Sequence, residues 1–343
     1  MNNILKKICL GTGELLKDKI ITRINTLNYF IENGGELIDT ARIYYDGKAL
    51  KKLSLIKKDY KIVSKVSYLN KDKNKNLQEK LKEYQLLTNK KKIDFFLTHW
   101  PTENNQEKLI KLMINLKSKK KVDKIGLGNT TYKKLKEIDH KIIKKIDVVQ
   151  IELNIFNFFY QKRLLSFCEK NKIKVFGYSP IKWCKYKKMD INLRKDLIFF
   201  KKKYRINFLD ICLLFSIYKK VIPIISIKNN QRLNKIIKLS HLLNNNNLKN
   251  KIFKFEKKIQ RTAYVNTEDI FYKINNKYVN IEKVRFDKKI LKMIMQEIKL
   301  QKSSLKPIIF NKIKEKYIVL DGKIRCKGLY QLNSKEKIYG III

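Results

Sequence analysis

The chain has 343 residues, of which 44% are hydrophobic, and a formal net charge of +48. This length suits one barrel of about 250 residues plus a small domain, and the hydrophobic content excludes a disordered chain. No apolar run approaches the roughly 18 residues that cross a bilayer, and the N-terminal apolar stretch is too short for a signal peptide. We therefore predict a cytoplasmic protein without a membrane partner.

The positive charge comes from lysine, because only nine of the 79 basic residues are arginine. The lysines run along the whole chain together with many Asn and Ile residues, whereas a nucleic-acid patch is clustered and richer in Arg. We predict solvated helix faces, a weak and salt-sensitive attraction to any polyanion, and no specific nucleic-acid partner. A nucleic-acid-associated protein is the third-ranked alternative.

The cysteines also exclude two classes of protein. There are five, an odd number, and no two of them form a C-x-x-C pair. This pattern argues against a disulfide framework and against a zinc site, so we predict reduced thiols and no metal.

Eight apolar segments alternate with lysine-rich stretches that have helical periodicity, such as Asn76–Leu87 and Gln106–Leu116. Apolar strands that alternate with amphipathic helices predict a parallel sheet, and eight units in this length predict an α/β fold of the (β/α)₈ TIM barrel type. The predicted strands are Lys7–Thr12, Glu36–Ala41, Lys61–Val66, Asp94–Trp100, Lys124–Asn129, Asp147–Asn154, Lys174–Pro180 and Val221–Ser226.

The polar stretch Leu242–Asn250 predicts a boundary after the eighth unit. We divide the chain into a barrel over residues 1–250, a linker or last helix over 251–274, and a small α+β module over 275–343. The elements predicted for the module are strands Ile281–Phe286, Lys306–Phe310, Lys316–Leu320 and Ile338–Ile343, and a helix Lys288–Lys299.

Four polar residues follow or end three consecutive predicted strands: Asp39, Tyr44, Lys65 and His99. Barrels collect their reactive groups at this end of the strands. A phenol beside a lysine makes a general acid, the aspartate would hold that lysine, and the histidine would orient a carbonyl. Taken singly, Asp39 could be an N-cap, Lys65 a surface residue and His99 a satisfied strand-end residue. Tyr45 is a rival for the role of Tyr44.

Several stretches, in order, resemble the aldo-keto reductases over residues 7–240. The resemblance implies that Tyr44 is the proton donor or acceptor, that Asp39, Lys65 and His99 complete a tetrad, and that a nicotinamide cofactor crosses the barrel mouth. The stretches are LGTG (10–13), LIDTARIY (37–44), SK (64–65), LTHWP (97–101), KIGLGN (124–129), VVQIELN (148–154), GYSP (177–180) and VIPIIS (221–226).

The resemblance also implies the residues that bind this cofactor. Asn129 and Gln150 match positions that hold the carboxamide, and Tyr178 matches the aromatic residue that stacks on the nicotinamide ring. Lys228 and Arg232 would suit a 2′-phosphate, so NADPH is favoured and NADH remains the alternative. The full set implied for the cofactor is Gly11, Thr12, Asp39, Asn129, Gln150, Tyr178, Ser179, Pro180, Ser226, Lys228 and Arg232.

The chain departs from the family pattern at three places. Tyr45 stands where Gly or Asn is usual, which narrows the pocket mouth. Gly128 replaces the usual Ser before Asn129, and the segment after the eighth strand lacks the Gly of one branch and the usual acidic-Asn ending.

The C-terminal module faintly resembles the ParB/sulfiredoxin-like fold. The matching residues are Asp321, Gly322 and Arg325, in a DG-x-x-R segment that would start a helix and hold nucleotide phosphates. The alternative is a hairpin turn at Asp321-Gly322 with a surface arginine. The module would then regulate the barrel or bind the nucleotide part of a larger substrate.

The leading prediction is an oxidoreductase that reduces an aldehyde or ketone with NAD(P)H, or runs the reverse reaction. Its partner would be a small-molecule carbonyl compound, with a sugar or nucleotide sugar as candidates. The runner-up is a non-catalytic nucleotide-binding regulator on a barrel scaffold. The sequence leaves the oligomeric state open.

Overall fold

The computed structural model describes residues 3–14, 20–66, 76–100, 106–181, 191–259, 261–265, 270–274, 277–280, 291, 295, 308–313, 316–332 and 338–342. The chain forms two compact units. Unit 1 comprises Met1–Asn154, Gln161–Ile181 and Leu209–Lys249, and unit 2 comprises Ile155–Tyr160, Lys182–Phe208 and Asn250–Ile343.

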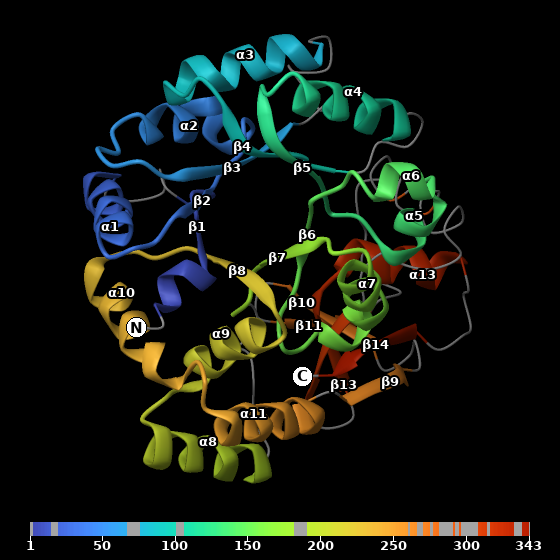
Figure 1. The fold of residues 1–343 in the computed structure, drawn as a ribbon. Coiled ribbons are helices and arrows are strands. Elements are labelled where there is room, and N and C mark those ends of the chain that lie inside the picture. The colour runs from blue at the N-terminus through green and yellow to red at the C-terminus, as the bar shows by residue number, and fades with distance from the viewer. Residues whose placement is uncertain are drawn as a thin grey trace. The chain divides into compact units, whose positions relative to one another are not determined.

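Unit 1 contains a closed barrel of eight parallel strands in the order of the chain (Figure 1). The prediction of a (β/α)₈ barrel is confirmed, and β3 has the predicted bounds. Continuous apolar runs locate these strands well because both faces of each strand are covered. The strands are β1 (Cys9–Gly11), β2 (Leu37–Asp39), β3 (Lys61–Val66), β4 (Ile93–Thr98), β5 (Val122–Gly128), β6 (Val148–Glu152), β7 (Lys174–Tyr178) and β8 (Val221–Ile225).

Helices connect successive barrel strands. Their starts follow ordinary capping chemistry: Asn76 and Glu79 form a reciprocal capping box at α3, and the Asn229 side chain accepts from the Arg232 amide at α10. The helices are η1 (Ile4–Lys7), α1 (Ile20–Glu32), η2 (Tyr44–Gly47), α2 (Lys48–Leu53), α3 (Leu77–Thr88), α4 (Gln106–Ser118), α5 (Tyr132–Glu137), α6 (His140–Ile143), α7 (Phe158–Lys170), α9 (Phe208–Tyr218), α10 (Asn230–Ile237) and η4 (Lys238–Leu242).

Lysine occupies positions at helix ends where glycine is usual. Lys120, after α4, and Lys172, after α7, have φ values of 55° and 58°. After α4, the amides of Lys120 and Lys121 donate to the carbonyls of Lys117 and Leu116, which is the pairing of a Schellman motif. A side chain in this left-handed conformation costs about 1 kcal/mol that glycine avoids.

Lys120→Gly is therefore expected to raise the free energy of unfolding by about 1 kcal/mol. The matched control is Lys111→Gly, an exposed position inside α4, where glycine should lower stability by about 1 kcal/mol. Urea denaturation of both variants measures the two shifts. Lower stability of Lys120→Gly than of the wild type would contradict this account.

The barrel interior is a continuous apolar cluster. Phe95 and Phe176 pack edge to face at its centre, with ring centroids 5.6 Å apart. Aromatic pairs in this geometry stabilise a core beyond the area that they bury. The buried members of the cluster are Cys9, Leu37, Val63, Phe95, Leu97, Val148, Phe176 and Ile224.

Unit 2 contains α8 (Ile191–Tyr204), α11 (Asn246–Ile259) from Asn250 onward, and a six-stranded sheet with α13 (Lys323–Leu332). Phe200 of α8 packs on Phe255 of α11, and Lys258 Nζ forms an ion pair with Asp196 Oδ2 at 2.7 Å. The sheet has the order β11-β10-β13-β12-β14-β9. Its strands are β9 (Arg261–Val265), β10 (Ile270–Ile274), β11 (Lys277–Asn280), β12 (Ile308–Ile313), β13 (Lys316–Asp321) and β14 (Ile338–Ile342).

The sheet begins earlier in the chain than the sequence predicts. Strands β9 and β10 and most of α11 occupy the range 251–274 that we assign to a linker or last helix. The strands predicted near 306–310, 316–320 and 338–343 are present as β12, β13 and β14. The predicted strand Ile281–Phe286, and the predicted helix Lys288–Lys299 apart from Leu291 and Met295, lie outside the described residues.

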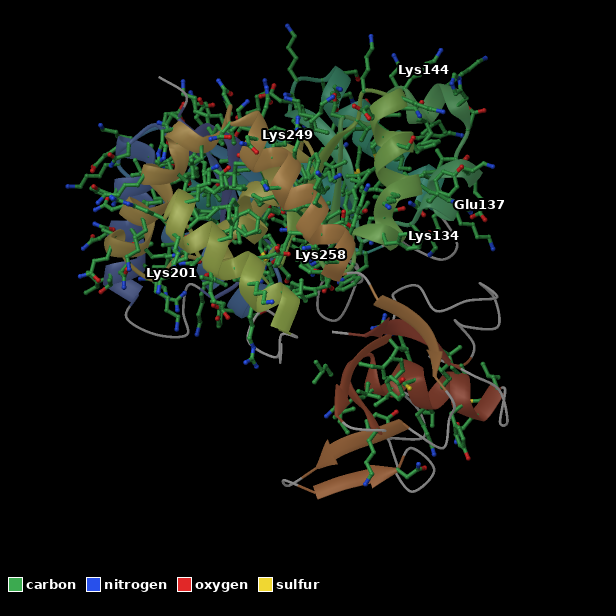
Figure 2. All side chains as sticks on the ribbon, turned by 90° about the horizontal axis from the view of Figure 1, so that it is seen from below. Lys134, Glu137, Lys144, Lys201, Lys249 and Lys258 are labelled. Carbon is green, nitrogen blue, oxygen red and sulfur yellow. The ribbon has the colours of Figure 1, made fainter. Side chains whose placement is uncertain are left out.

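Basic side chains are distributed over both units. In Figure 2, labelled lysines project from each unit, Lys134 and Lys144 from unit 1 and Lys201 and Lys258 from unit 2. This spread is what a uniform lysine enrichment produces. Among the helices that the structure describes, none combines the length and the apolar character that a membrane crossing requires.

Candidate active site at the C-terminal ends of the strands

The ends of β2 and β3 bring Asp39 and Lys65 together. Lys65 Nζ lies 2.7 Å from Asp39 Oδ1 and donates to the Thr40 carbonyl at 2.8 Å. Only 4% of the lysine side chain and 5% of the aspartate side chain are exposed. Asp39 is therefore a partner of a buried cation, and neither the helix-cap alternative nor the surface-lysine alternative applies.

The structure separates Tyr44 from its neighbour Tyr45. Lys65 Nζ lies 5.3 Å from the centroid of the Tyr44 ring, and the His99 ring is 6.0 Å from it at 84°. Tyr45 turns away with a left-handed φ of 53°, and its hydroxyl donates to the Gly13 carbonyl at 3.2 Å. Tyr44 is thus the tyrosine that joins Asp39, Lys65 and His99.

The charges around Tyr44 act in opposite directions on its pKa. The Lys65 cation lowers the pKa of the phenol, but burial and the Asp39 carboxylate raise it, and the net pKa is raised. The sequence predicts a lowered pKa from the lysine alone, and this prediction is wrong for the net shift. For Lys65, burial lowers the pKa, but the effects of Asp39 and Tyr44 outweigh burial. The net pKa of Lys65 is raised, so the ammonium stays charged. A protonated phenol next to a fixed cation results.

His99 follows β4 and is held neutral. Burial, with a smaller contribution from the Lys65 cation, lowers the pKa of its imidazole to about 3. The ring stacks on Trp100 with the planes 2° apart, and the buried Nδ1 has no hydrogen-bond partner among the described residues. His99 is therefore available at neutral pH as an uncharged hydrogen-bonding group.

The depressed pKa of His99 makes stability depend on pH in a defined direction. The unfolded state binds a proton below about 6.5, whereas the folded state resists protonation until the pKa of about 3. The neutral His99 side chain thus leaves stability unchanged above about pH 6.5. Stability is lost as the pH falls from about 6.5 to about 3, because the unfolded state gains a proton that the folded state does not bind. Urea unfolding of the wild type and of His99→Asn between these limits tests this, and the variant should lose less stability. Equal losses would contradict it.

Asn129 follows β5, Gln150 lies within β6 and Tyr178 ends β7, and all three form hydrogen bonds within the site. Gln150 Nε2 donates to Asp39 Oδ1 at 2.6 Å. The Tyr178 hydroxyl donates to Asn129 Oδ1 at 2.6 Å, and Asn129 Nδ2 donates to the His99 carbonyl at 2.8 Å. The Asn129 amide also donates to the Gln150 carbonyl at 2.7 Å, so these residues form one polar network that includes the Asp39 carboxylate.

At Gly128, which precedes Asn129 of this network, there is no room for a side chain. A Cβ added to it would come within 2.3 Å of the Thr98 carbonyl oxygen. Its amide donates to Thr98 Oγ1 at 3.3 Å. The serine usual at this position in the family would therefore require β4 and β5 to move apart.

The other residues implied for a cofactor surround the same end of the barrel. Gly11 ends β1, and Thr12, which is fully buried, has a hydroxyl oxygen without a partner among the described residues. Ser179 has a φ of 57°, and Pro180 is buried beside it. Ser226, Lys228 and Arg232 follow β8, and the first two are exposed. The guanidinium of Arg232 is paired with the buried Asp210 at 3.2 Å.

Tyr84 of α3 is a residue that the sequence argument missed. It is 1% exposed, its hydroxyl donates to the Lys65 carbonyl, and it accepts from the Arg42 amide at 3.3 Å. Arg42 in turn pairs with Glu83 at 2.6 Å. Tyr84 therefore ties the strand that carries Lys65 to the loop that leads to Tyr44. No local motif marks it, because both of its partners are backbone groups distant in sequence.

Tyr84→Phe is expected to lower the free energy of unfolding by about 1–3 kcal/mol, since two buried backbone groups lose their partner. It should also lower kcat. Tyr60→Phe is the matched control, because the Tyr60 hydroxyl is buried and donates to the Leu53 carbonyl at 3.1 Å. Both variants should lose stability in urea, but only Tyr84→Phe should lose turnover. Equal kcat values for the two variants would contradict a positioning role.

In the C-terminal sheet, α13 begins directly after Asp321 and Gly322. Gly322 has a φ of 80°, and an added Cβ would lie 2.8 Å from Arg325 Nη2. The segment therefore starts a helix, and the alternative of a hairpin turn is wrong. A phosphate contact by Asp321, Gly322 and Arg325 stays a prediction.

Thiols and acidic groups add no second reactive centre to the described part of the chain. Cys9, Cys168, Cys212 and Cys326 are buried, and none of the four is in a disulfide. Burial raises the pKa of Cys168 and of Cys326 to about 12. No cluster of His, Cys, Asp and Glu among the described residues could hold a metal ion.

The fold and the site define a (β/α)₈ protein with a buried Lys–Asp pair, a phenol and a neutral imidazole at the barrel mouth. The model of the aldo/keto reductase family matches residues 7–250. The chain belongs to the aldo/keto reductase family, as the motifs over residues 7–240 predict.

Curated relatives are about one quarter identical to this chain over the residues that align. The 9,11-endoperoxide prostaglandin H2 reductase of Trypanosoma cruzi is 26% identical over 185 residues, which are 53% of this chain and 64% of that protein. The chain thus spans less than two thirds of this relative's length. The methylglyoxal reductase DkgB of Escherichia coli O157:H7 is 25% identical over 193 residues, 54% of this chain and 70% of that protein.

Solved structures share the fold. An aldo-keto reductase from Klebsiella pneumoniae in complex with NADPH has a TM-score of 0.60 and 18% identity, and the match covers 73% of this chain and 91% of that one. A Bombyx mori aldo-keto reductase in complex with NADP has a TM-score of 0.58 and 21% identity, covering 72% and 88%.

Proposed function

We propose that the barrel is an NADPH-dependent oxidoreductase that reduces an aldehyde or ketone to an alcohol, or catalyses the reverse reaction. One observation carries the proposal: a buried Lys65–Asp39 pair lies under the Tyr44 phenol, with the neutral His99 beside it. A scaffold without catalysis gains nothing from a buried cation next to a phenol, because burying such a pair is costly.

The residues divide the work of carbonyl reduction among them. Tyr44 holds a proton at neutral pH, since its pKa is raised, and donates it to the oxygen as negative charge develops there. The Lys65 cation stabilises the phenolate that remains, and Asp39 holds this cation in place. Neutral His99 donates a hydrogen bond that orients the carbonyl. In the alcohol-to-carbonyl direction, Tyr44 takes the proton back.

The residues at the mouth fit a nicotinamide dinucleotide. Thr12 Oγ1 and His99 Nδ1 are buried polar atoms without a partner among the described residues, which suits a polar molecule bound at this end. Asn129, Gln150 and Tyr178 would hold and stack on its nicotinamide end. The bound cofactor supplies the hydride.

NADPH is favoured over NADH on two grounds. Structural neighbours are solved with NADPH or NADP bound. Lys228 is exposed after β8 and suits a 2′-phosphate, whereas Arg232 already pairs with Asp210. Arg232 thus serves first to hold α10 against α9, and Lys228 is the stronger candidate for the phosphate.

The substrate we propose is a small-molecule carbonyl compound. The curated relatives are named as reductases of methylglyoxal and of a prostaglandin endoperoxide. A sugar or nucleotide sugar remains a candidate. The exposed Trp100 and the Tyr45 ring, which crosses to Gly13, would border the entrance.

Fluorescence titration with NADPH and NADH tests the cofactor proposal. We expect saturable binding of NADPH and weaker binding of NADH. Absence of binding for both would overturn the proposal. Binding without turnover of any carbonyl compound would favour the second candidate, a nucleotide-binding regulator on a barrel scaffold.

A further inference from the structure

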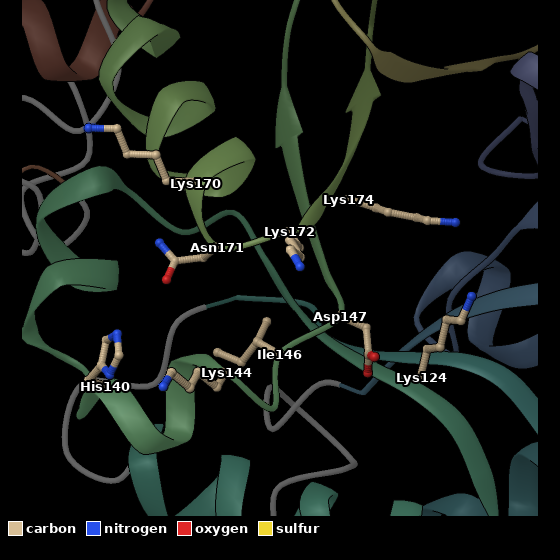
Figure 3. Close-up of a pocket in the computed structure, with 9 residues that line it drawn as sticks. All are labelled: Lys124, His140, Lys144, Ile146, Asp147, Lys170, Asn171, Lys172 and Lys174. Atoms are coloured by element: carbon tan, nitrogen blue, oxygen red, sulfur yellow. The ribbon is translucent and has the colours of Figure 1, made fainter.

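A cavity of about 600 Å³ lies at the opposite end of the barrel from the site described above. It opens where β5, β6 and β7 begin: Lys124 is near the start of β5, Asp147 precedes β6, and Lys174 starts β7 (Figure 3). The other ends of these strands carry Asn129, Gln150 and Tyr178. The cavity therefore plays no part in the proposed carbonyl chemistry.

Five of the nine residues that line this cavity are lysines: Lys124, Lys144, Lys170, Lys172 and Lys174. Figure 3 shows that they come from different elements around the opening, namely β5, the end of α6, the end of α7 and the turn into β7. Several ammonium groups around one concave surface raise each other's electrostatic energy, and a bound anion relieves this repulsion.

The acidic residue of the cavity does not balance these lysines. Both carboxylate oxygens of Asp147 accept from Lys117 Nζ, at 2.7 and 2.6 Å, and Oδ2 also accepts from the Ile125 amide at 2.9 Å. Lys117 is on α4 and does not line the cavity. Asp147 is thus already neutralised by a cation outside the cavity, and no other acidic residue of the described chain lines the cavity.

The backbone that carries the lysines is well defined. After α7, the Lys172 amide donates to the Glu169 carbonyl at 3.1 Å, and the Ile173 amide donates to the Cys168 carbonyl at 2.8 Å. The Lys174 amide donates to the Asp147 carbonyl at 2.9 Å. These bonds fix Lys170, Lys172 and Lys174 around the rim, so little ordering of the backbone would oppose ligand binding.

We propose that this cavity binds an oligophosphate anion, either inorganic or as the phosphate chain of a nucleotide. Lysines act as point charges that a chain of phosphate oxygens can contact in several geometries. The volume accommodates such a chain, whereas single-stranded nucleic acid needs a basic groove with aromatic stacking platforms. The residues that line this cavity include no aromatic side chain other than His140.

The test is isothermal titration of the full chain with inorganic tripolyphosphate, ATP and orthophosphate at physiological salt. The pocket variant is Lys144→Gln/Lys172→Gln. The matched control, Lys82→Gln/Lys111→Gln, removes the same charge from exposed positions on α3 and α4. All four side chains are exposed, so unfolding midpoints should match the wild type and show that each variant folds.

We expect the pocket variant to bind tripolyphosphate about tenfold more weakly and the control less than twofold more weakly. Any phosphate site at the barrel mouth remains in both variants, so the difference reports on this cavity alone. Equal losses of affinity for tripolyphosphate and ATP in the pocket variant would assign the phosphate chain as the whole ligand, and a larger loss for ATP would assign a nucleotide. Equal weakening in both variants would overturn the proposal, because it would show attraction by overall charge only.

Discussion

Tyr44→Phe is expected to lower kcat for carbonyl reduction by roughly 10²–10⁴-fold, the usual contribution of a general acid. The centroid of the Tyr44 ring lies 5.3 Å from Lys65 Nζ, and the neutral His99 ring forms a T-shaped contact with the Tyr44 ring. Removal of the hydroxyl leaves the ring and its packing intact. Affinity for NADPH should therefore stay within about twofold of the wild type, since the change removes a contact made to the substrate.

Tyr45→Phe is the control for this prediction. The Tyr45 hydroxyl bonds to the Gly13 carbonyl and not to the Lys65 group, so its loss should leave kcat near the wild-type value. Steady-state kinetics of both variants with one aldehyde substrate decide the matter. Loss of turnover in Tyr45→Phe with retention in Tyr44→Phe would contradict the assignment of the proton donor.

Asp39→Asn is expected to lower the free energy of unfolding by about 3–5 kcal/mol, the cost of breaking one partner of a buried ion pair. The variant leaves the Lys65 ammonium in a site where its side chain is only 4% exposed. The amide cannot neutralise this cation, although the Thr40 carbonyl still accepts from it. Urea denaturation measures the loss, and kcat should fall with it because Lys65 is no longer held.

Two further variants make this prediction specific. Asp39→Asn/Lys65→Met removes both charges and should regain much of the lost stability, since no uncompensated cation remains. Glu169→Gln breaks an ion pair on the surface, in which the Glu169 side chain is 69% exposed and the Lys220 side chain 82% exposed. This variant should not move the unfolding midpoint. A double variant no more stable than Asp39→Asn would contradict a buried pair of charges.

The barrel could be predicted from the sequence because its signal is local. Each strand is a short, largely apolar run, and helices such as α4 combine exposed lysines with a buried apolar face. For β3, Lys61–Val66, the predicted and observed bounds agree. The first strands of the second sheet escaped prediction because β9 and β10 have only five residues each. They also lie in the range 251–274, which we assign to a linker or last helix.

The part of the site that the strands themselves position could be predicted from the sequence. Asp39, Lys65 and His99 meet because parallel strands bring their carboxyl ends to one rim. The choice between Tyr44 and Tyr45 could not be made from the sequence, since it depends on the left-handed turn at Tyr45 and Asp46. The pairing of Arg232 with Asp210 joins two helices and has no local signal either.

The sign of the Tyr44 pKa shift required the structure for a different reason. A sequence shows that a lysine is available, but it does not show how deeply the phenol is buried or how close the Asp39 carboxylate lies. Burial and the carboxylate together outweigh the lysine and raise the pKa. The proposed acid therefore starts the reaction protonated.

The most direct test of the central proposal is NADPH consumption by the purified full chain, followed by near-ultraviolet absorbance against a panel of carbonyl compounds. Methylglyoxal, an aromatic aldehyde and an aldose cover the candidate classes. The account predicts that NADPH is consumed with at least one of them in proportion to the alcohol formed, and that Tyr44→Phe does not consume it. Saturable NADPH binding with no consumption for any compound, or equal consumption by Tyr44→Phe, would contradict it.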